Sequence, residues 1–330
     1  MRLSRLGEFG LIERIRRTSA DGRGVRLGIG DDCAWVKHSS GSSLITADLL
    51  IEGVHFDLRW TTLYDLGHKS LAVNLSDIAA MGGTPAYVIL SLGIPGNFDS
   101  KQIDEFYRGF NLLAEHCGIA LVGGDTNLAK NLIISVCLIG HPPARPVRRA
   151  GARVNDDIYV TGTLGDSALA LNFLQRKSPR SNAGAITKLL ARHHRPTARL
   201  GAGAILAKLN LAAAMIDISD GLLQDLGHIC RSSRTGALIW EERLPLSGEY
   251  RLLSGKADSS FALSGGEDYE LLFCARPRYR RRIERLGMRA GVSITRIGCC
   301  VPAEQGIKVI DGSGKAKSLR LKGHDHFRKQ

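Results

Sequence analysis

The sequence lacks the features that mark membrane and secreted proteins. Among its 330 residues, no apolar run approaches the roughly 20 residues that a helix needs to cross a bilayer. Its beginning, MRLSRLGEFGLIERIRR, has helical amphipathicity but neither the apolar segment nor the cleavage site of a signal peptide. We therefore expect a soluble globular protein of the cytoplasm that has no membrane partner.

The sequence also lacks any arrangement of cysteines that predicts a disulfide framework or a zinc site. Their number, seven, is odd, no C-x-x-C pair occurs, and most of them lie inside apolar stretches. Domains stapled by disulfides or zinc need paired, regularly spaced cysteines. We therefore expect buried, reduced thiols.

The common nucleotide-binding and metal-binding motifs are missing as well. Neither Gly255-Lys256 nor Gly314-Lys315 is followed by Ser or Thr or preceded by the glycine that a Walker A loop requires. The chain has no protein-kinase signature, no Rossmann Gly-x-Gly-x-x-Gly and no His-Glu-x-x-His. If the chain binds a nucleotide, it must therefore do so through other groups.

Composition and charge narrow the class of protein further. An apolar fraction of 44% can fill the cores of two ordinary domains or of one large domain. The net charge is +13, and the arginine-rich residues 276–289 could form either the solvated face of an amphipathic helix or a nucleic-acid patch. Because no nucleic-acid motif or aromatic stacking run accompanies them, we expect the helix face and no nucleic-acid partner. The positive field also favours anionic substrates.

Strand-like apolar runs alternate with helical patterns along the chain, which predicts an α/β or α+β fold. In the first part, strands are expected over 44–47, 86–92, 120–122 and 132–139, and helices over 67–81 and 103–116. The Pro- and Arg-rich residues 141–151 favour a linker. After it, strands are expected over 157–161, 214–218 and 269–274, helices over 167–174, 186–192, 202–209 and 222–232, and an exposed loop over 177–182. We therefore expect two mixed α/β domains, residues 1–144 and 145–330.

Carboxylates stand where several of the apolar strands are expected to end. They occur in the segments 28–32 (GIGDD), 46–48 (TAD), 123–125 (GGD) and 217–221 (DISDG). Mg²⁺ prefers oxygen ligands and is usually held by a few carboxylates together with water and substrate phosphates. Acids brought together from such distant segments therefore predict magnesium-dependent phosphate chemistry.

The surroundings of the acids differ. Asp31 and Asp32 follow glycines and point to opposite sides, so only one is expected to face a given site, and a plain polar turn is the alternative. Asp48 lies in an apolar stretch, where an unpaired charge would be costly and a metal ion would neutralise it. The segment 264–268 (SGGED) combines two glycines with two acids and favours a loop that shapes a substrate site.

Two further segments place polar side chains on a helix or directly before one. Asn74 and Asp77 are three residues apart and share one helix face, which is either a site wall or a solvated face. Asp217 and Asp220 end a strand and precede a helix, whose N-cap would be Ser219 or Asp220. The start of that helix would present backbone N–H groups to phosphate oxygens.

These segments resemble the thiamine-monophosphate kinase family. The resemblance rests on GEFGLI (7–12), GIGDDCA (28–34), DLGHKSLAVNLSDIAAMGGTP (65–85), GGDT (123–126), DISDGLLQDLGHI (217–229), SGGEDYELLF (264–273) and KGHDHF (322–327). They follow the order of the family along nearly the whole chain. Some also echo the wider superfamily of aminoimidazole ribonucleotide synthetase and selenophosphate synthetase, whereas SGGEDYEL and KGHDHF point to the kinase.

The resemblance implies transfer of the γ-phosphoryl group of ATP to thiamine monophosphate, giving thiamine diphosphate and ADP, the last step of thiamine diphosphate biosynthesis. It also implies a homodimer formed by the sheet of the N-terminal domain, with ATP in a cleft between the two domains. Several Mg²⁺ ions would offset the repulsion between the anionic substrates, and in-line attack by a phosphate oxygen needs no covalent intermediate or strong general base. The alternative is another ATP-dependent enzyme of the superfamily, such as aminoimidazole ribonucleotide synthetase.

The resemblance also implies roles for particular residues. Magnesium positions are Asp32, Thr46, Ala47, Asp48, Asp77, Asp125, Asp217 and Asp220; ATP positions are Tyr107, Gly124, Asp125, Arg149 and Ser219; thiamine-phosphate positions are His55, Glu267 and Phe327. Ala47 stands where many members carry Ser or Thr, so only its backbone carbonyl could serve. Arg149 would donate two hydrogen bonds to a phosphate, and Phe327 would stack on an aromatic ring of thiamine.

Overall fold

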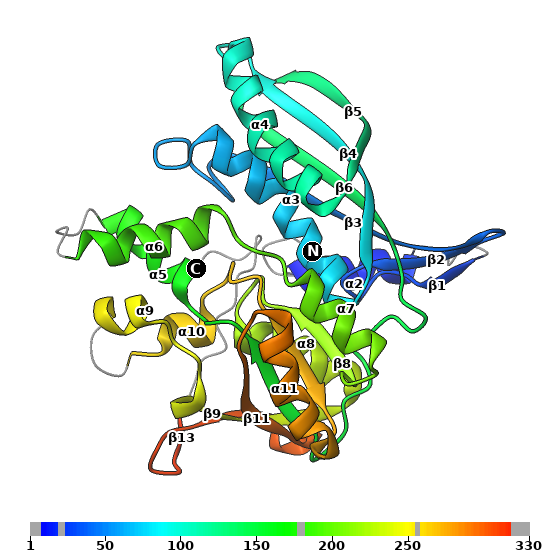
Figure 1. The fold of residues 1–330 in the computed structure, drawn as a ribbon, viewed down its shortest axis with the longest axis vertical. Helices are drawn as coiled ribbons and strands as arrows, with labels where there is room; N and C mark the ends of the chain where they lie inside the picture. Colours follow the sequence, from blue (N-terminus) through cyan, green and yellow to red (C-terminus); the bar gives the residue numbers. More distant parts are fainter. Residues whose placement is uncertain (1–7, 19–23, 177–181, 255–257, 318–330) are drawn as a thin grey trace.

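The computed structural model describes residues 8–18, 24–176, 182–254 and 258–317, which form two mixed β-sheets flanked by helices (Figure 1). The first sheet has the strand order β1-β2-β3-β6-β4-β5. Its strands are β1 (Val25–Leu27), β2 (Ala34–His38), β3 (Gly41–Ile51), β4 (Thr84–Pro95), β5 (Ala120–Ala129) and β6 (Ile133–His141). β4 and β5 run parallel, and the other neighbours are antiparallel. By the strand order, β5 forms one edge of the sheet.

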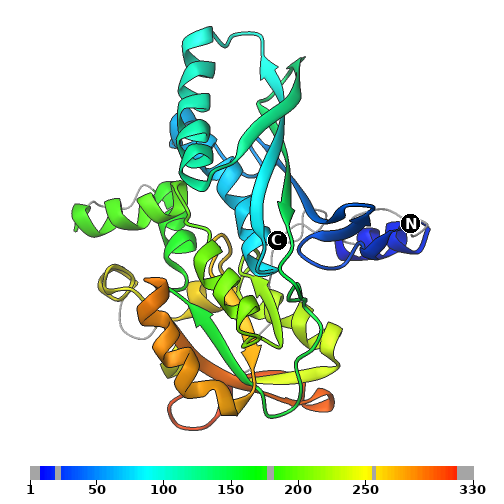
Figure 2. The same ribbon diagram turned by 45° about the vertical axis from the view of Figure 1, so that its right-hand side comes forward.

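Helices α3 (Leu63–Ala80) and α4 (Ser100–Cys117) cover one face of this first sheet (Figures 1 and 2). Because side chains alternate along a strand, Val88 of β4 is buried in the core with the helices while Tyr87 and Ile89 are exposed. The other face of the sheet therefore presents apolar side chains to solvent in the single chain. The short helix α2 (Glu8–Thr18) lies beside β1 and β2 (Figure 1).

Local signals fix the ends of both long helices and the point where they cross. The side chain of Thr62 accepts a hydrogen bond from the backbone N–H of Asp65, and Asp99 and Gln102 form a capping box at the start of α4. At the crossing, a Cβ atom on Gly109 would overlap the backbone oxygen of Tyr64. The glycine therefore permits the close approach of α4 to the start of α3.

The second sheet has the strand order β13-β12-β9-β11-β7-β10-β8. Its strands are β7 (Asp157–Thr161), β8 (Ala214–Asp217), β9 (Thr235–Trp240), β10 (Leu271–Ala275), β11 (Ile294–Pro302), β12 (Ile307–Ile310) and β13 (Ala316–Lys317). The neighbours are antiparallel except for β9 and β12. β8, which ends in Asp217, is an edge strand of this sheet.

Both faces of the second sheet are covered, unlike those of the first. The helices of this half are α5 (Asp166–Arg176), α6 (Ala183–His194), α7 (Leu200–Lys208), α8 (Leu222–Ser233), α9 (Gly248–Leu253), α10 (Ser260–Ser264) and α11 (Arg280–Ala290), with single 3-10 turns η1 (Glu241–Arg243), η2 (Pro277–Tyr279) and η3 (Ala303–Gln305). Tyr159 and Phe273 pack with α7 and α11, while Ile158 and Leu272 pack with α8 on the opposite face. None of the helices in the described ranges is long and apolar enough to span a membrane.

Helix α3 belongs to the first half of the chain but also contacts the second. Ala79, in its last turn, lies against α7, where a Cβ atom on Gly203 would overlap the backbone oxygen of Ala79. The backbone N–H of Val147, in the segment between β6 and β7, donates to the oxygen of Met81 at 3.2 Å. The two halves therefore meet along α3, which lies between them in Figure 1.

The predicted mixed α/β fold is confirmed, and every strand or helix expected within the described residues is present. α11 has the expected amphipathic pattern, because Ile283 and Leu286 are buried and Arg281, Arg282 and Arg285 are exposed. The sequence did not predict β1, β2, β9, β11, β12, β13, α9 or α10, which are short or lack a clear period. The expected loop over 177–182 lies, apart from its last residue, outside the described residues.

The prediction that the carboxylates stand where strands end is wrong for two of them. Asp48 lies in the middle of β3 and pairs with Val136, and Asp125 lies inside the edge strand β5 and pairs with Ser91. Strand β3 continues because Asp48 shares its face with Leu44 and Leu50, so the alternation of the strand is kept. A polar residue in an apolar run is therefore part of the strand here.

Candidate active site

Three carboxylates meet where the two halves of the chain come together. Asp32 follows β1, Asp77 lies on α3, and Asp217 is the last residue of β8. One carboxylate oxygen from each lies within 4.8 Å of the others. Asp32 and Asp217 are buried, with 7% and 3% of their surface exposed. We call Asp32, Asp77 and Asp217 the acid trio.

The electrostatics of the acid trio favour a bound cation. Burial, followed by the charges of Asp48, Asp217 and Asp32, raises the pKa of Asp77 well above its usual value. Burial and then the charge of Asp32 raise the pKa of Asp217 to about 7, and burial raises the pKa of Asp48 to about 6. In the described part of the chain, no group donates a hydrogen bond to Oδ2 of Asp32. Crowded, buried and incompletely paired carboxylates of this kind fit a divalent cation.

Two hydrogen-bond donors reach the acid trio from the first half and from the segment between the sheets. Thr46 Oγ1 donates to Asp77 Oδ2 at 2.5 Å, and the guanidinium of Arg149 donates to Asp32 Oδ1 at 2.8 Å. Asp31 instead accepts the backbone N–H of Arg149 at 3.2 Å. Of the two adjacent acids, therefore, Asp32 belongs to the trio and Asp31 holds the backbone beside it.

The structure corrects the expected cap of the helix that follows β8. The N-cap of α8 is Gly221, which makes no side-chain cap, so neither Ser219 nor Asp220 has that role. Instead, Asp225 Oδ2 accepts the backbone N–H groups of Ser219, Asp220 and Gly221, each at 3.1 Å. These N–H groups, which the sequence offered to phosphate, already have an acceptor. Burial and then the charge of Asp220 raise the pKa of Asp225 well above its usual value.

The other predicted metal positions differ in their exposure and in their hydrogen-bond partners. Thr46 and Asp48 lie on the buried face of β3, whereas the side chain of Ala47 lies on the opposite, exposed face. Asp220 Oδ2 accepts a hydrogen bond from Gln224 at 2.8 Å. Asp125 is exposed on β5, where its oxygens accept from the backbone of Thr126 and from Asn127. In the single chain, Asp125 is not part of the trio.

Two predicted ATP positions, Tyr107 and Gly124, lie on elements that carry no member of the acid trio. Tyr107 is half-buried on α4 and packs edge-on against Phe106 at 5.7 Å between ring centroids. Gly124 lies on the edge strand β5. Asn74, by contrast, is fully buried, and its Nδ2 donates to the oxygen of Ser70, so the solvated-face alternative for this helix is wrong at that position.

A second group of polar side chains surrounds Glu267, one of the predicted substrate positions. Lys69 Nζ lies 2.9 Å from Glu267 Oε1, and His193 Nδ1 lies 3.4 Å from Oε2. Burial raises the pKa of Glu267, but the charge of Lys69 and its hydrogen bond lower it, and the net direction is down. His55 accepts the backbone N–H of Ile51 at 3.0 Å. Phe327 lies outside the described residues.

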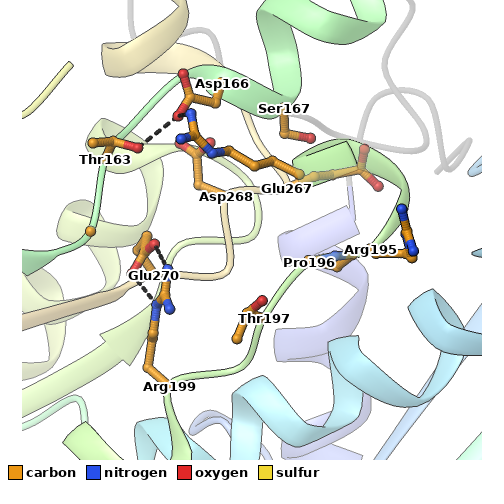
Figure 3. Close-up of a pocket in the computed structure, with 12 residues that line it drawn as sticks. Thr163, Asp166, Ser167, Arg195, Pro196, Thr197, Arg199, Glu267, Asp268 and Glu270 are labelled. Atoms are coloured by element: carbon orange, nitrogen blue, oxygen red, sulfur yellow. Dashed lines mark hydrogen bonds and ion pairs between the residues drawn. The ribbon is translucent and has the colours of Figure 1, made fainter. Parts of the chain in front are cut away.

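A cavity of about 230 Å³ adjoins Glu267 (Figure 3). Glu267, Asp268 and Glu270 follow one another along the segment that borders it. Arg192, Arg195 and Arg199 also line it, and Arg199 is paired with Glu270. Both charge signs therefore line this cavity.

Comparison with known proteins places this geometry in a family. The family model for AIR synthase related protein, N-terminal domain, matches residues 30–141. The thiamine-monophosphate kinase of Aquifex aeolicus (strain VF5) is 38% identical over 99% of this chain and 100% of that protein. The chain belongs to the thiamine-monophosphate kinase family. Its member from Escherichia coli (strain K12) is 39% identical over 97% of this chain and 98% of its own.

A solved structure in the thiamine-monophosphate kinase family has the same fold throughout. The structure described as AaThiL complexed with AMPPCP and TMP has a TM-score of 0.84 and 37% identity, and 99% of each chain is covered. The described residues of this chain therefore have the fold of the kinase family.

Within this kinase fold, three residues near the predicted site were missed by the reasoning from sequence. Lys69 and His193 contact Glu267, and Asp225 holds the loop after β8. A signal existed for Lys69, because it is the only lysine or arginine in the expected helical segment 67–81. For His193, at the end of a helix rich in basic residues, the sequence gave no comparable signal.

Proposed function

We propose that this chain catalyses ATP-dependent phosphorylation of thiamine monophosphate, giving thiamine diphosphate and ADP. The observation that carries the proposal is the acid trio, placed with Arg149 where the two halves of a kinase-family fold meet. The similarity to a structure complexed with AMPPCP and TMP, which covers 99% of each chain, supports ATP and thiamine monophosphate as the two substrates. The reaction is a phosphoryl transfer between two anions, which needs positioning and charge neutralisation more than acid–base chemistry.

The acid trio would hold Mg²⁺, with Asp48, Asp220 and Thr46 beside it and the backbone of Ala47 next in β3. Mg²⁺ bound there would supply positive charge that offsets the repulsion between the phosphates of the two substrates. The raised pKa values of Asp77, Asp217 and Asp48 support this assignment, because these buried carboxylates have too few cationic partners in the described protein.

The remaining predicted residues would bind the two substrates. Arg149 would orient a phosphate of ATP through its planar guanidinium, together with Tyr107, Gly124, Asp125 and Ser219. His55, Glu267 and Phe327 would bind thiamine monophosphate. A phosphate oxygen of that substrate is already anionic near neutral pH, so no side chain has to remove a proton from it.

We further propose a homodimer that forms through the first sheet, with domains at residues 1–144 and 145–330. Edge strand β5 and the uncovered sheet face expose large apolar side chains: Leu49, Tyr87, Ile89, Leu121, Val122 and Leu128. Unpaired edges and apolar patches of this kind favour association. Gly124 and Asp125 lie on the same edge, so a dimer would cover these predicted ATP residues. Seven free cysteines are consistent with the cytoplasm as the compartment.

An end-point assay tests the proposed reaction. The purified protein is incubated with ATP, Mg²⁺ and thiamine monophosphate, the thiamine phosphates are oxidised to their fluorescent thiochromes, and the diphosphate is separated from the monophosphate by chromatography. We expect product with the wild type and none with Asp48→Ala or Asp220→Ala, while circular dichroism shows that both variants fold. Asp104→Ala, an exposed acid on α4, is the matched control and should keep its activity. Wild-type turnover in both site variants would contradict the metal assignment.

A further inference from the structure

Lys69 is a buried lysine in the middle of a helix. Its exposed fraction is 3%, and no other lysine is buried in the part of the chain that the structure describes. It lies on α3 between Gly67 and Leu71, both buried. An ammonium group is costly to bury unless it is paired, and the partner of this one is Glu267 Oε1 at 2.9 Å. The pair joins α3 in the first half of the chain to the loop before β10 in the second.

The second oxygen of Glu267 faces a buried histidine. His193 Nδ1 lies 3.4 Å from Oε2 and 2.8 Å from Ser167 Oγ, and 5% of the histidine is exposed. Burial and then the charge of Lys69 lower the pKa of His193 to about 3, so the imidazole is neutral. The carboxylate is thus held between one cation and one neutral ring. Its side chain keeps 28% of its surface exposed, so a ligand can still reach it.

Hydrogen bonds tie the backbone around Glu267 to the loop after β8, which carries predicted nucleotide and metal residues. The N–H of Glu267 donates to the oxygen of Ser219 at 2.7 Å, and the N–H of Tyr269 donates to the oxygen of Ile218 at 2.8 Å. Glu267 itself has φ +66°, a left-handed conformation that non-glycine residues adopt at a cost of order 1 kcal/mol or more. A Cβ atom on Gly266 would overlap the oxygen of Ser219. The loop therefore holds the carboxylate in one place at an energetic cost, which is typical of a functional residue.

We propose that Lys69, supported by His193, is a positioning residue that holds the Glu267 carboxylate in the orientation needed to bind thiamine monophosphate. The inference rests on the proposed function, because it concerns the acceptor side of that site. A flexible glutamate would lose rotamer freedom on binding, whereas one already held by an ion pair does not. Lys69 therefore acts on affinity for the acceptor through Glu267 and not by contact with ATP.

A double-mutant cycle separates this role from a merely structural one. The variants are Lys69→Met, Glu267→Gln and the double variant, and the readouts are the KM for thiamine monophosphate and the KM for ATP. We expect each single variant to raise the KM for thiamine monophosphate roughly 10- to 100-fold, the range for a charge-assisted hydrogen bond, and to change the KM for ATP by less than about twofold. If Lys69 acts through Glu267, the double variant should be no worse than Glu267→Gln.

A second ion pair on the same helix provides the matched control. Asp65, one helical turn before Lys69, pairs with Arg195 at 3.2 Å and also joins the two halves. Asp65→Asn should leave the KM for thiamine monophosphate unchanged, because it breaks a bridge between the halves without touching Glu267. If Lys69→Met fails to fold, the double variant can still be compared with Glu267→Gln, because neither charge is left unpaired in the double variant. This comparison alone tests whether Lys69 acts through Glu267.

The outcomes distinguish the two proposals. A wild type that makes no thiamine diphosphate overturns the proposed function. A wild type that makes it, together with an unchanged acceptor KM in Lys69→Met, overturns the positioning role alone. A double variant that is worse than Glu267→Gln by the full effect of Lys69→Met also overturns it, because the two residues would then act independently.

Discussion

Replacing Asp217 with asparagine tests whether the acid trio is held together against its own repulsion. Asp217 is buried, and one of its oxygens lies within 4.8 Å of oxygens of Asp32 and Asp77. Burial and the charge of Asp32 move its pKa from 3.8 to about 7. Since a pKa change of one corresponds to about 1.4 kcal/mol, the ionised group costs the folded state roughly 4 kcal/mol above pH 7.

The sign of the pH dependence follows from where the proton is held. Between about pH 4 and pH 7 the folded protein keeps a proton on Asp217 that the unfolded chain has lost, so stability falls as the pH rises through this window. The cost is absent below about pH 4 and reaches roughly 2 kcal/mol at pH 5.5. In the absence of Mg²⁺, Asp217→Asn should therefore be more stable than the wild type, and more so at pH 8 than at pH 5.5.

Thermal unfolding in EDTA measures the effect. At about 2–4 °C per kcal/mol, the gain at pH 8 is at most about 8–16 °C, with roughly half of it at pH 5.5. These are upper limits, because a buried amide also needs hydrogen-bond partners. Excess Mg²⁺ should raise the Tm of the wild type more than that of the variant, since only the wild type keeps the full set of ligands.

Asp104→Asn, on the exposed surface of α4, is the control and should not change the Tm under any of these conditions. A variant that is no more stable than the wild type in EDTA at pH 8 would refute the reasoning. So would a gain that is larger at pH 5.5, since the repulsion must grow as the carboxylates ionise.

Two further predictions concern the packing of α4 and the exposed edge strand β5. Gly109→Ala should lower the free energy of unfolding by roughly 1–3 kcal/mol, because the new methyl group would overlap the backbone of Tyr64, and a urea titration measures this. Gly184→Ala, in open space on α6, should be neutral or slightly stabilising. Leu128→Lys, at an 82% exposed position on β5, should convert a dimer to monomers in sedimentation, whereas Leu112→Lys on α4 should not.

Much of the fold was predictable because its long elements have clear periods. α3, α4 and β6 match the expected segments with ends that differ by a few residues. The expected ranges of two strands were too short, because the apolar run stops at Asp48 in β3 and at Gly123 and Gly124 in β5. Both Asp48 and Asp125 nevertheless lie inside strands, because the position of each strand in the sheet accommodates them. Asp48 faces the core side of the sheet, and Asp125 faces solvent at the edge.

The acid trio itself was predictable in part, and its surroundings were not. Asp32, Asp77 and Asp217 could be named from sequence because each stands in a distinctive segment, and the structure brings them together. The ion pair of Lys69 and Glu267 joins residues far apart in the chain, so no local pattern indicates it. The role of Asp225 was also hidden, because an acid in the first turn of a helix is commonplace.

Helix α3 carries Lys69 and Asp77 on one rigid rod. Eight residues at a rise of 1.5 Å per residue place them about 12 Å apart along the axis. Lys69, at one end of this interval, pairs with Glu267, and Asp77, at the other end, belongs to the acid trio. Because a helix keeps its length, α3 fixes the separation between the Glu267 pair and the acid trio. Under the proposed function, this fixed separation would select an acceptor by its length as well as by its chemical groups.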